Sequence, residues 1–149
     1  MPTLAYNRRA TFDYEILESF EAGMVLFGYE VKAIKTGHLS LAGSYVTVRN
    51  GEVYLINAYI PPYQPKNTPA DYEPTRTRKL LLRKSEIASL IGKTKQRGLT
   101  LVPLKAYTKK GKIKLEFALA RGKRKFDKRE KIIERETKRK IDRAIREKF

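Results

Sequence analysis

Residues 44–60 read SYVTVRNGEVYLINAYI, and this stretch decides the fold class. Two runs rich in Val, Ile and Tyr flank Asn50-Gly51, and residues of these types favour β-strands. Asn-Gly supplies the positive φ angles that a two-residue type I′ turn requires. Val46 and Val48 share one face of the first run, because side chains alternate along a strand. The stretch therefore predicts a β-hairpin, the basic unit of an antiparallel sheet.

Similar patterns on both sides of the hairpin predict more strands. Strand-like alternation or apolar runs occur in residues 11–20, 75–82, 99–107 and 113–119. Together with the hairpin this gives about six short strands, joined by turns such as Lys109-Lys110-Gly111-Lys112. Short antiparallel strands of this kind favour a closed or nearly closed barrel, because closure removes exposed strand edges.

Two segments have the spacing of short helices. In residues 28–35, Lys32 and Lys35 lie three apart, and so do two apolar side chains, which predicts a helix with a basic outer face. Ser85 is the expected N-cap of the second helix, and Gly98 its expected end. With two or three helices beside the strands, the fold class is mainly β with some α.

The chain is strongly basic, with a formal net charge of +17 over 149 residues. Residues 123–149 hold 13 Lys or Arg and 6 Asp or Glu, and residues 1–122 still carry +10. Charge of this size favours a polyanionic partner through counterion release. We therefore expect one barrel domain, residues 1–122, and a basic C-terminal tail, residues 123–149. A highly charged tail of this kind is expected to be disordered when free and helical on its target.

Several protein classes are excluded by composition. The chain has no cysteine, so disulfides, zinc-thiolate sites and thiol catalysis are absent. No apolar run is long enough to span a membrane, and the first residues lack the pattern of a secretion signal. We expect a cytoplasmic protein.

For the tail, two interpretations stay open on charge alone. Blocks of like charge often act as solubilising or nonspecific nucleic-acid tails. Alternatively, the tail docks in an RNA groove, where Phe126 stacks on a base.

The segment from Pro74 to Arg83 is the main candidate surface of the body. Alternation places Arg76 and Arg78 on one face and Lys79, Leu81 and Arg83 on the other. This second set, which we expect to point outward, mixes hydrogen-bond donors with a leucine, as a nucleic-acid surface does. The simpler interpretation is that the charged residues form the start of a strand whose leucines lie in the core.

The sequence gives little support for an active site. His38 is the only histidine and follows a glycine in an expected loop. Asp13 and Glu15 resemble the carboxylates of a metal-dependent nuclease only weakly, since no second Asp or His accompanies them. No glycine-rich phosphate loop is present. We therefore expect no enzymatic activity, no metal and no cofactor.

An ordered set of short motifs extends over nearly the whole chain. The motifs are Asn7-Arg8-Arg9-Ala10, Phe20-Glu21-Ala22-Gly23, Gly28-Tyr29-Glu30-Val31-Lys32, Ser44-Tyr45-Val46, residues 74–82, Gly122-Lys123-Arg124 and Asp127-Lys128-Arg129. In this order and spacing, the sequence resembles the bacterial SsrA-binding proteins, also called small protein B. These proteins are the partners of transfer-messenger RNA in ribosome rescue.

The resemblance implies an OB-fold-like antiparallel barrel of six strands with three helices. It implies binding to the tRNA-like domain of transfer-messenger RNA, and delivery to stalled ribosomes with the GTP-bound elongation factor Tu. On the ribosome, the barrel would replace a missing anticodon stem in the A site. The tail would lie on small-subunit rRNA in the empty mRNA channel and become helical there. A general RNA chaperone or a ribosomal protein is the open alternative.

The resemblance also assigns site residues. Glu21, Leu81 and the position of Arg83 match functional positions of the body, although some relatives carry a smaller polar residue at position 83. Further RNA contacts implied in the body are Asn7, Arg8, Lys32, Lys35, Arg76, Arg78 and Lys79. The tail positions implied near the decoding centre are Gly122, Lys123, Arg124, Phe126, Asp127, Lys128 and Arg129. Position 126 is Phe where other members carry His or Tyr.

Overall fold

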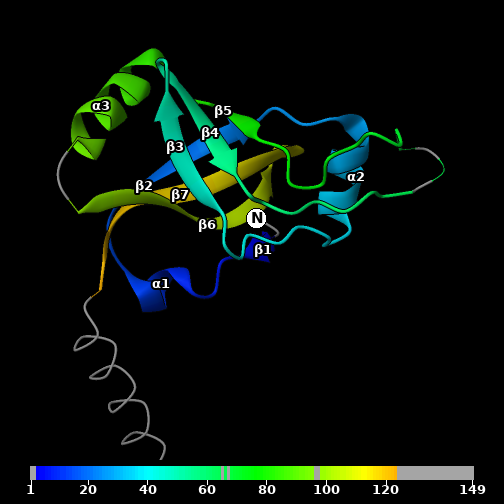
Figure 1. Ribbon diagram of the computed structural model, residues 1–149, viewed down its shortest axis with the longest axis horizontal. Helices are drawn as coiled ribbons and strands as arrows, with labels where there is room; N and C mark the ends of the chain where they lie inside the picture. The colour runs from blue at the N-terminus through cyan, green and yellow to red at the C-terminus, as the bar shows by residue number, and fades with distance from the viewer. Residues whose placement is uncertain (1–2, 65, 67, 96–97, 124–149) are drawn as a thin grey trace, which may run out of the picture.

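The computed structural model describes residues 3–64, 66, 68–95 and 98–123 (Figure 1). The elements in chain order are β1 (Thr3–Tyr6), α1 (Ala10–Asp13), β2 (Tyr14–Met24), α2 (Gly28–Lys35), β3 (Tyr45–Arg49), β4 (Glu52–Ile56), β5 (Arg78–Leu81), α3 (Lys84–Thr94), β6 (Leu99–Lys109) and β7 (Lys112–Gly122). No helix among these residues is long and apolar enough to cross a membrane.

The strands form one antiparallel sheet that closes on itself. Their order is β1-β6-β3-β4-β5-β2-β7, and β6 also pairs with β7. Six strands therefore complete a ring, and β1 is added beside β6. The predicted OB-fold-like arrangement of six antiparallel strands with three helices is confirmed, while β1 was not expected. The ring is closed unevenly, because β3 and β6 share only the pair Val46–Leu101, whereas β6 and β7 pair along their whole length.

The core lies inside the ring, as the alternating patterns predict. Every second side chain of β7, at Ile113, Leu115, Phe117 and Leu119, is buried. The predicted hairpin is present as β3 and β4, with Asn50 and Gly51 at φ of 50° and 75°. Both turn residues therefore adopt the left-handed conformation of a type I′ turn.

Local boundaries differ from the prediction at two helices. Residues Ala10–Asp13 form a short helix, so the strand expected from residue 11 begins only at Tyr14. Ala10 is buried against Val102 and Ala120, and this packing holds the chain in a turn. The helix with its expected N-cap at Ser85 and its expected end at Gly98 spans Lys84–Thr94. It begins earlier than predicted because Arg83 is the N-cap, and the Arg83 amide donates to the carboxylate of Glu86.

A side lobe projects from the ring. It consists of α2 and the described residues of the proline-rich loop, 57–64, 66 and 68–77, which lie next to α2 at the right of Figure 1. Tyr72 ties the loop together, since its hydroxyl donates to the Ile60 carbonyl at 2.8 Å and to Glu30 on α2 at 3.0 Å. Arg78 on β5 donates to Glu30 at 2.7 Å and so anchors the lobe to the ring.

Candidate nucleic-acid interface

The outer face of β5 carries the exposed part of the Pro74–Arg83 segment. Arg78 and Leu80 are buried, whereas Lys79 and Leu81 point to solvent. Leu81 is 54% exposed, which is unusual for a leucine on a strand beside a closed core. The predicted outward set of Lys79, Leu81 and Arg83 thus agrees with the structure.

Leu81 lies beside β2, and residues of β2 and β5 line a groove there. Gly23 pairs with Leu81 across the two strands. A groove of about 560 Å³ is lined by Glu21, Gly23, Leu81, Arg83 and Lys114, among others. We call these five residues the β2–β5 surface. The three positions that the resemblance marked as functional, Glu21, Leu81 and Arg83, therefore meet in one place.

Lys114 is the residue of this surface that sequence reasoning missed. The strict alternation of β7 shows that Lys114 points away from the core. Only the sheet order brings it beside Gly23, with which it pairs across β2 and β7. Strand neighbours that are far apart in the sequence leave no local signal, so the lysine could not be assigned in advance.

Glu21 is held as a carboxylate by its neighbours. The Tyr107 hydroxyl donates to Glu21 Oε2, and Lys109 Nζ lies 3.3 Å from Glu21 Oε1. The hydrogen bond from Tyr107 lowers the pKa of Glu21, and Lys109 lowers it further. Burial, with the hydrogen bond to Glu21, raises the pKa of Tyr107, which stays protonated. A carboxylate repels phosphate, so Glu21 is suited to accept from base amino groups or ribose hydroxyls.

Arg78 does not reach solvent. Its side chain and that of Glu30 are fully buried, with Arg78 Nη2 and Nε at 2.7 and 2.9 Å from Glu30 Oε2. The guanidinium also donates to the carbonyls of Ala58 and Pro74, at 2.7 and 2.9 Å. The expectation that Arg78 contacts RNA disagrees with this burial. A buried arginine needs a full set of acceptors, and here these all come from the fold.

Arg76 contacts the buried Glu30 and is also partly exposed at the surface. Its guanidinium hydrogen-bonds to both carboxylate oxygens of Glu30 and lies 4.0 Å from the centre of the Phe27 ring. The side chain is 22% exposed. Burial alone would raise the pKa of Glu30, but hydrogen bonds from Arg76, the Phe27 amide and Arg78 lower it below its usual value. Glu30 is therefore a buried anion with four donating residues, including Tyr72.

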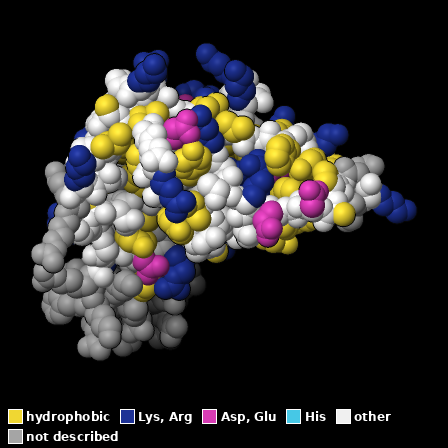
Figure 2. Space-filling view, turned by 45° about the horizontal axis from the view of Figure 1, so that its top comes forward, with side chains coloured by type: hydrophobic (Ala, Val, Ile, Leu, Met, Phe, Trp, Pro, Cys, Tyr) yellow, Lys and Arg dark blue, Asp and Glu magenta, His cyan; other side chains and the backbone are white. Residues whose placement is uncertain are grey.

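The other predicted cations of the body lie on separate parts of the surface. Lys32 and Lys35 are exposed on α2. Lys79 is exposed on β5, where its Nζ pairs with Glu52 at 2.9 Å. Figure 2 likewise shows Lys and Arg side chains spread over several parts of one face instead of a single patch.

Asn7 and Arg8 lie between β1 and α1 and do not line the β2–β5 surface. Asn7 Nδ2 donates to the Pro103 carbonyl at 2.9 Å, and its backbone amide donates to Leu104 at 2.8 Å. Asn7 therefore fixes the start of the chain onto β6. Arg8 is exposed, and no hydrogen bond or ion pair of its side chain is found within the described part of the chain.

The start of the tail is anchored beside α1. Gly122 ends β7 opposite Tyr14. The Lys123 amide donates to the Asp13 carbonyl at 2.9 Å, and its Nζ donates to the Thr11 carbonyl at 2.7 Å. The predicted tail residues Arg124, Phe126, Asp127, Lys128 and Arg129, and the predicted tail helix, lie outside the described residues.

The structure offers no support for the nuclease alternative. Asp13 pairs with Arg9 at 3.3 Å, and Glu15 is exposed on β2. In residues 3–64, 66, 68–95 and 98–123, no group of three His, Cys, Asp or Glu side chains is placed to hold a metal ion.

Comparison with known proteins identifies the family. The family model described as SmpB protein matches residues 4–147. The chain belongs to the SmpB family. Relatives called SsrA-binding protein include one from Thermosynechococcus vestitus, 48% identical over 97% of this chain and 95% of its own length. Another, from Pelotomaculum thermopropionicum, is 51% identical over 96% of this chain and 93% of its own length.

A solved structure shares the SmpB fold. It is described as "tmRNA-SmpB: a journey to the center of the bacterial ribosome", and its chain is 48% identical to this one. The match covers 86% of this chain and 93% of that chain, with a TM-score of 0.67. The predicted resemblance is thereby confirmed, while the roles of individual residues stay predictions.

Proposed function

We propose that this SmpB-family chain binds the tRNA-like domain of transfer-messenger RNA through the β2–β5 surface. The single observation that carries the proposal is the meeting of Glu21, Leu81, Arg83 and Lys114 around one groove. An exposed leucine between two cations suits an unstacked base and its flanking phosphates. Family membership supplies the identity of the RNA, because the matched relatives are SsrA-binding proteins.

Binding measurements on surface variants test this proposal. Leu81→Ala and Arg83→Ala should each weaken binding to the isolated tRNA-like domain by about tenfold, the effect of losing about 1.4 kcal/mol. Arg49→Ala is the matched control, since Arg49 is exposed at the end of β3 and does not line the groove. Equal affinities for all four proteins, with unchanged circular dichroism, would contradict the assignment of this surface.

A general RNA chaperone or a ribosomal protein is the competing function. Such a protein would bind unrelated structured RNAs as tightly as the tRNA-like domain. Competition at about 0.15 M salt separates the two, because nonspecific phosphate contacts are already weakened there. We expect an excess of unrelated structured RNA to displace the tRNA-like domain poorly. Equal competition would favour the chaperone.

We further propose that the protein delivers transfer-messenger RNA to stalled ribosomes, together with elongation factor Tu. Residues 124–149 then enter the empty mRNA channel and become helical there. Because Lys123 is held by Thr11 and Asp13, the tail starts from a fixed point beside α1. A protein ending at Lys123 should keep its affinity for the tRNA-like domain and lose tagging on stalled ribosomes. Normal tagging by this truncated protein would refute the channel role.

A further inference from the structure

Glu21, which lines the β2–β5 surface, lies directly opposite another carboxylate. Glu21 on β2 pairs with Glu116 on β7 across the two strands. Like charges that face each other on neighbouring strands repel, so each carboxylate needs partners of its own to keep its position. Lys105 Nζ lies 3.4 Å from Glu116 Oε2 and is the partner of that carboxylate. Glu21 must therefore be held by other residues.

Tyr107 holds Glu21 from the far side of β7. Tyr107 lies on β6, where it pairs with Lys114 of β7, and β7 in turn pairs with β2. The Tyr107 hydroxyl donates a hydrogen bond to Glu21 Oε2. The tyrosine side chain thus spans the outer face of β7 and connects β6 with β2.

The Tyr107 hydroxyl is a donor with a fixed position. Tyr107 is only 6% exposed, Thr3 of β1 pairs with it, and Lys105 Nζ lies 5.6 Å from the centre of its ring. Burial and the hydrogen bond to Glu21 raise the pKa of Tyr107, so the hydroxyl keeps its proton. Lys109 also contacts Glu21, but its side chain is 43% exposed and its distances are 3.3 and 3.5 Å. Tyr107 therefore sets the direction of the carboxylate, while Lys109 mainly contributes charge.

Tyr107 acts on the β2–β5 surface only through Glu21. Among the described residues that line the groove, Glu21 is present and Tyr107 is not. A carboxylate has about four acceptor positions, more than Tyr107 and Lys109 occupy. The Glu21 side chain is also 37% exposed. Its remaining acceptor positions are therefore open to hydrogen-bond donors of a bound RNA.

We propose that Tyr107 is a positioning residue for RNA binding, whose hydroxyl holds the Glu21 carboxylate in place at the β2–β5 surface. A carboxylate held there accepts from base amino groups and ribose hydroxyls and repels phosphates. Its position thus decides which part of the RNA lies against it. The inference rests on the function proposed above, because it requires that Glu21 contacts the RNA.

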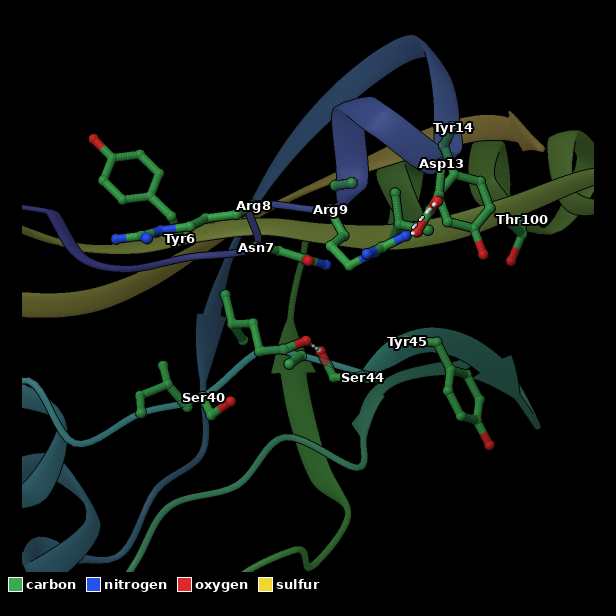
Figure 3. Close-up of a pocket in the computed structure, with 16 residues that line it drawn as sticks. Tyr6, Asn7, Arg8, Arg9, Asp13, Tyr14, Ser40, Ser44, Tyr45 and Thr100 are labelled. Carbon is green, nitrogen blue, oxygen red and sulfur yellow. Dashed lines mark hydrogen bonds and ion pairs between the residues drawn. The ribbon is translucent and has the colours of Figure 1, made fainter. Parts of the chain in front are cut away.

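The effect of Tyr107 is separable from the RNA contacts that the resemblance implies at Asn7 and Arg8. These two residues line a different groove, between residues 6–10 and 39–45 (Figure 3). Neither Glu21 nor Tyr107 is among the described residues that line it. A loss of affinity that depends on Tyr107 and Glu21 together therefore reports on the β2–β5 surface.

Tyr107→Phe tests the proposal, because it keeps the buried ring and removes the hydroxyl. We expect it to weaken binding of the full-length protein to the isolated tRNA-like domain by about tenfold, as for the loss of one hydrogen bond to a charged group. Tyr54→Phe is the matched control, since the Tyr54 hydroxyl donates to Glu52 at 2.5 Å and neither residue lines the groove. The control should bind as the original protein does. Equal affinities for the two variants would overturn the proposal.

A double-mutant cycle separates positioning from a general structural role. Glu21→Ala removes the carboxylate and should weaken binding by about tenfold or more. Adding Tyr107→Phe to Glu21→Ala should then cost less than about twofold, because no carboxylate is left for the hydroxyl to position. A tyrosine that only stabilised the fold would lower the affinity by the same factor in both backgrounds, and that result would refute the proposal.

The pKa of Glu21 provides a second measurement. The hydrogen bond from Tyr107 is the largest cause that lowers this pKa, and Lys109 and Lys114 lower it further. Tyr107→Phe should therefore raise the pKa of Glu21, and Tyr54→Phe should leave it unchanged. ¹³C nuclear magnetic resonance of the Glu21 carboxyl group between about pH 3 and pH 7 measures the pKa. An unchanged pKa in Tyr107→Phe would show that the hydroxyl does not hold the carboxylate.

The outcomes keep this inference apart from the proposed function. If Tyr107→Phe binds normally while Leu81→Ala and Arg83→Ala weaken binding, the β2–β5 surface is retained and the positioning role is refuted. If Leu81→Ala, Arg83→Ala and Glu21→Ala all bind normally, the proposed function is refuted, and the positioning role fails with it.

Discussion

At the scale of single residues, Glu30 is the main connection between the lobe and the ring. Its carboxylate accepts hydrogen bonds from the Phe27 amide, from Tyr72 in the proline-rich loop, and from Arg76 and Arg78 at the entry to β5. Two segments that are far apart in the sequence, the start of α2 and residues 72–78, are thus joined by one buried anion. Removing one partner of such a pair leaves an uncompensated charge in the interior.

Replacement of Arg78 should therefore destabilise the protein strongly. We expect Arg78→Met to lower the free energy of unfolding by about 3–5 kcal/mol, because Glu30 would stay buried without its main cation. Urea unfolding followed by circular dichroism measures the change. The control is Lys79→Met at the exposed neighbouring position, which should leave the midpoint almost unchanged. Similar midpoints for the two variants would contradict the structural role of Arg78.

The pH dependence of stability should also report on Glu30. Its pKa in the folded protein lies below the ordinary 4.5, so ionised Glu30 stabilises the fold above pH 4.5. This contribution is lost as the pH falls through the folded pKa. We expect the stability difference between the original protein and Glu30→Gln to be large at pH 6–7 and to shrink below about pH 4.5. Urea unfolding at several pH values measures it, and a constant difference down to pH 3 would count against this interpretation.

At the scale of elements, local patterns predicted strands better than they predicted helix boundaries. The Asn50-Gly51 turn and the alternation of Ile113, Leu115 and Phe117 are set by neighbouring residues, and both were found as expected. The turn at Ala10 depends on packing against β6 and β7, which the local sequence does not reveal. Tertiary contacts therefore overrode the strand-like pattern at residues 11–13, while the strand expected over the rest of residues 11–20 is present as part of β2.

The β3–β4 hairpin permits a direct test of its turn. Gly51→Ala should destabilise the protein by about 1–2 kcal/mol, because an L-residue is strained at the φ of 75° found there. Gly28→Ala is the matched control. Gly28 begins α2 with no atom within 4 Å of an added Cβ, so alanine should stabilise by about 0.4–1 kcal/mol. Thermal unfolding compares the two, and equal effects would show that the turn geometry does not limit stability.

At the scale of the whole molecule, the ring brings together what the sequence separates. Glu21 on β2, Leu81 on β5 and Lys114 on β7 are neighbours only because β2 lies between β5 and β7. The resemblance marked Glu21 and Leu81, but no local pattern could add Lys114. Alternation along β5 had already placed Arg78 opposite the outward set, and the position of α2, which brings Glu30 against Arg78, accounts for its complete burial. The residue types of the site could therefore be predicted from the sequence, while the full set of residues that belong to it depended on the order of the strands in the sheet.

The distribution of charge between body and tail leads to a prediction about salt. Residues 124–149 carry 12 of the 33 Lys and Arg residues, and without them the chain still has a net charge of +11. We compare the full chain with a protein that ends at Lys123. If the body alone binds the tRNA-like domain, a plot of the logarithm of the affinity against the logarithm of the salt concentration should have nearly the same slope for both proteins.

Fluorescence anisotropy between about 0.05 and 0.3 M salt measures both slopes. A tail that acted as a general polyanion binder would release additional counterions, roughly 0.7–0.9 per phosphate contact, and would steepen the slope of the full chain by several units. Such a difference would show that the tail holds the same RNA as the body. Equal slopes would leave the tail available for a separate site, because its cations are then not engaged by the tRNA-like domain.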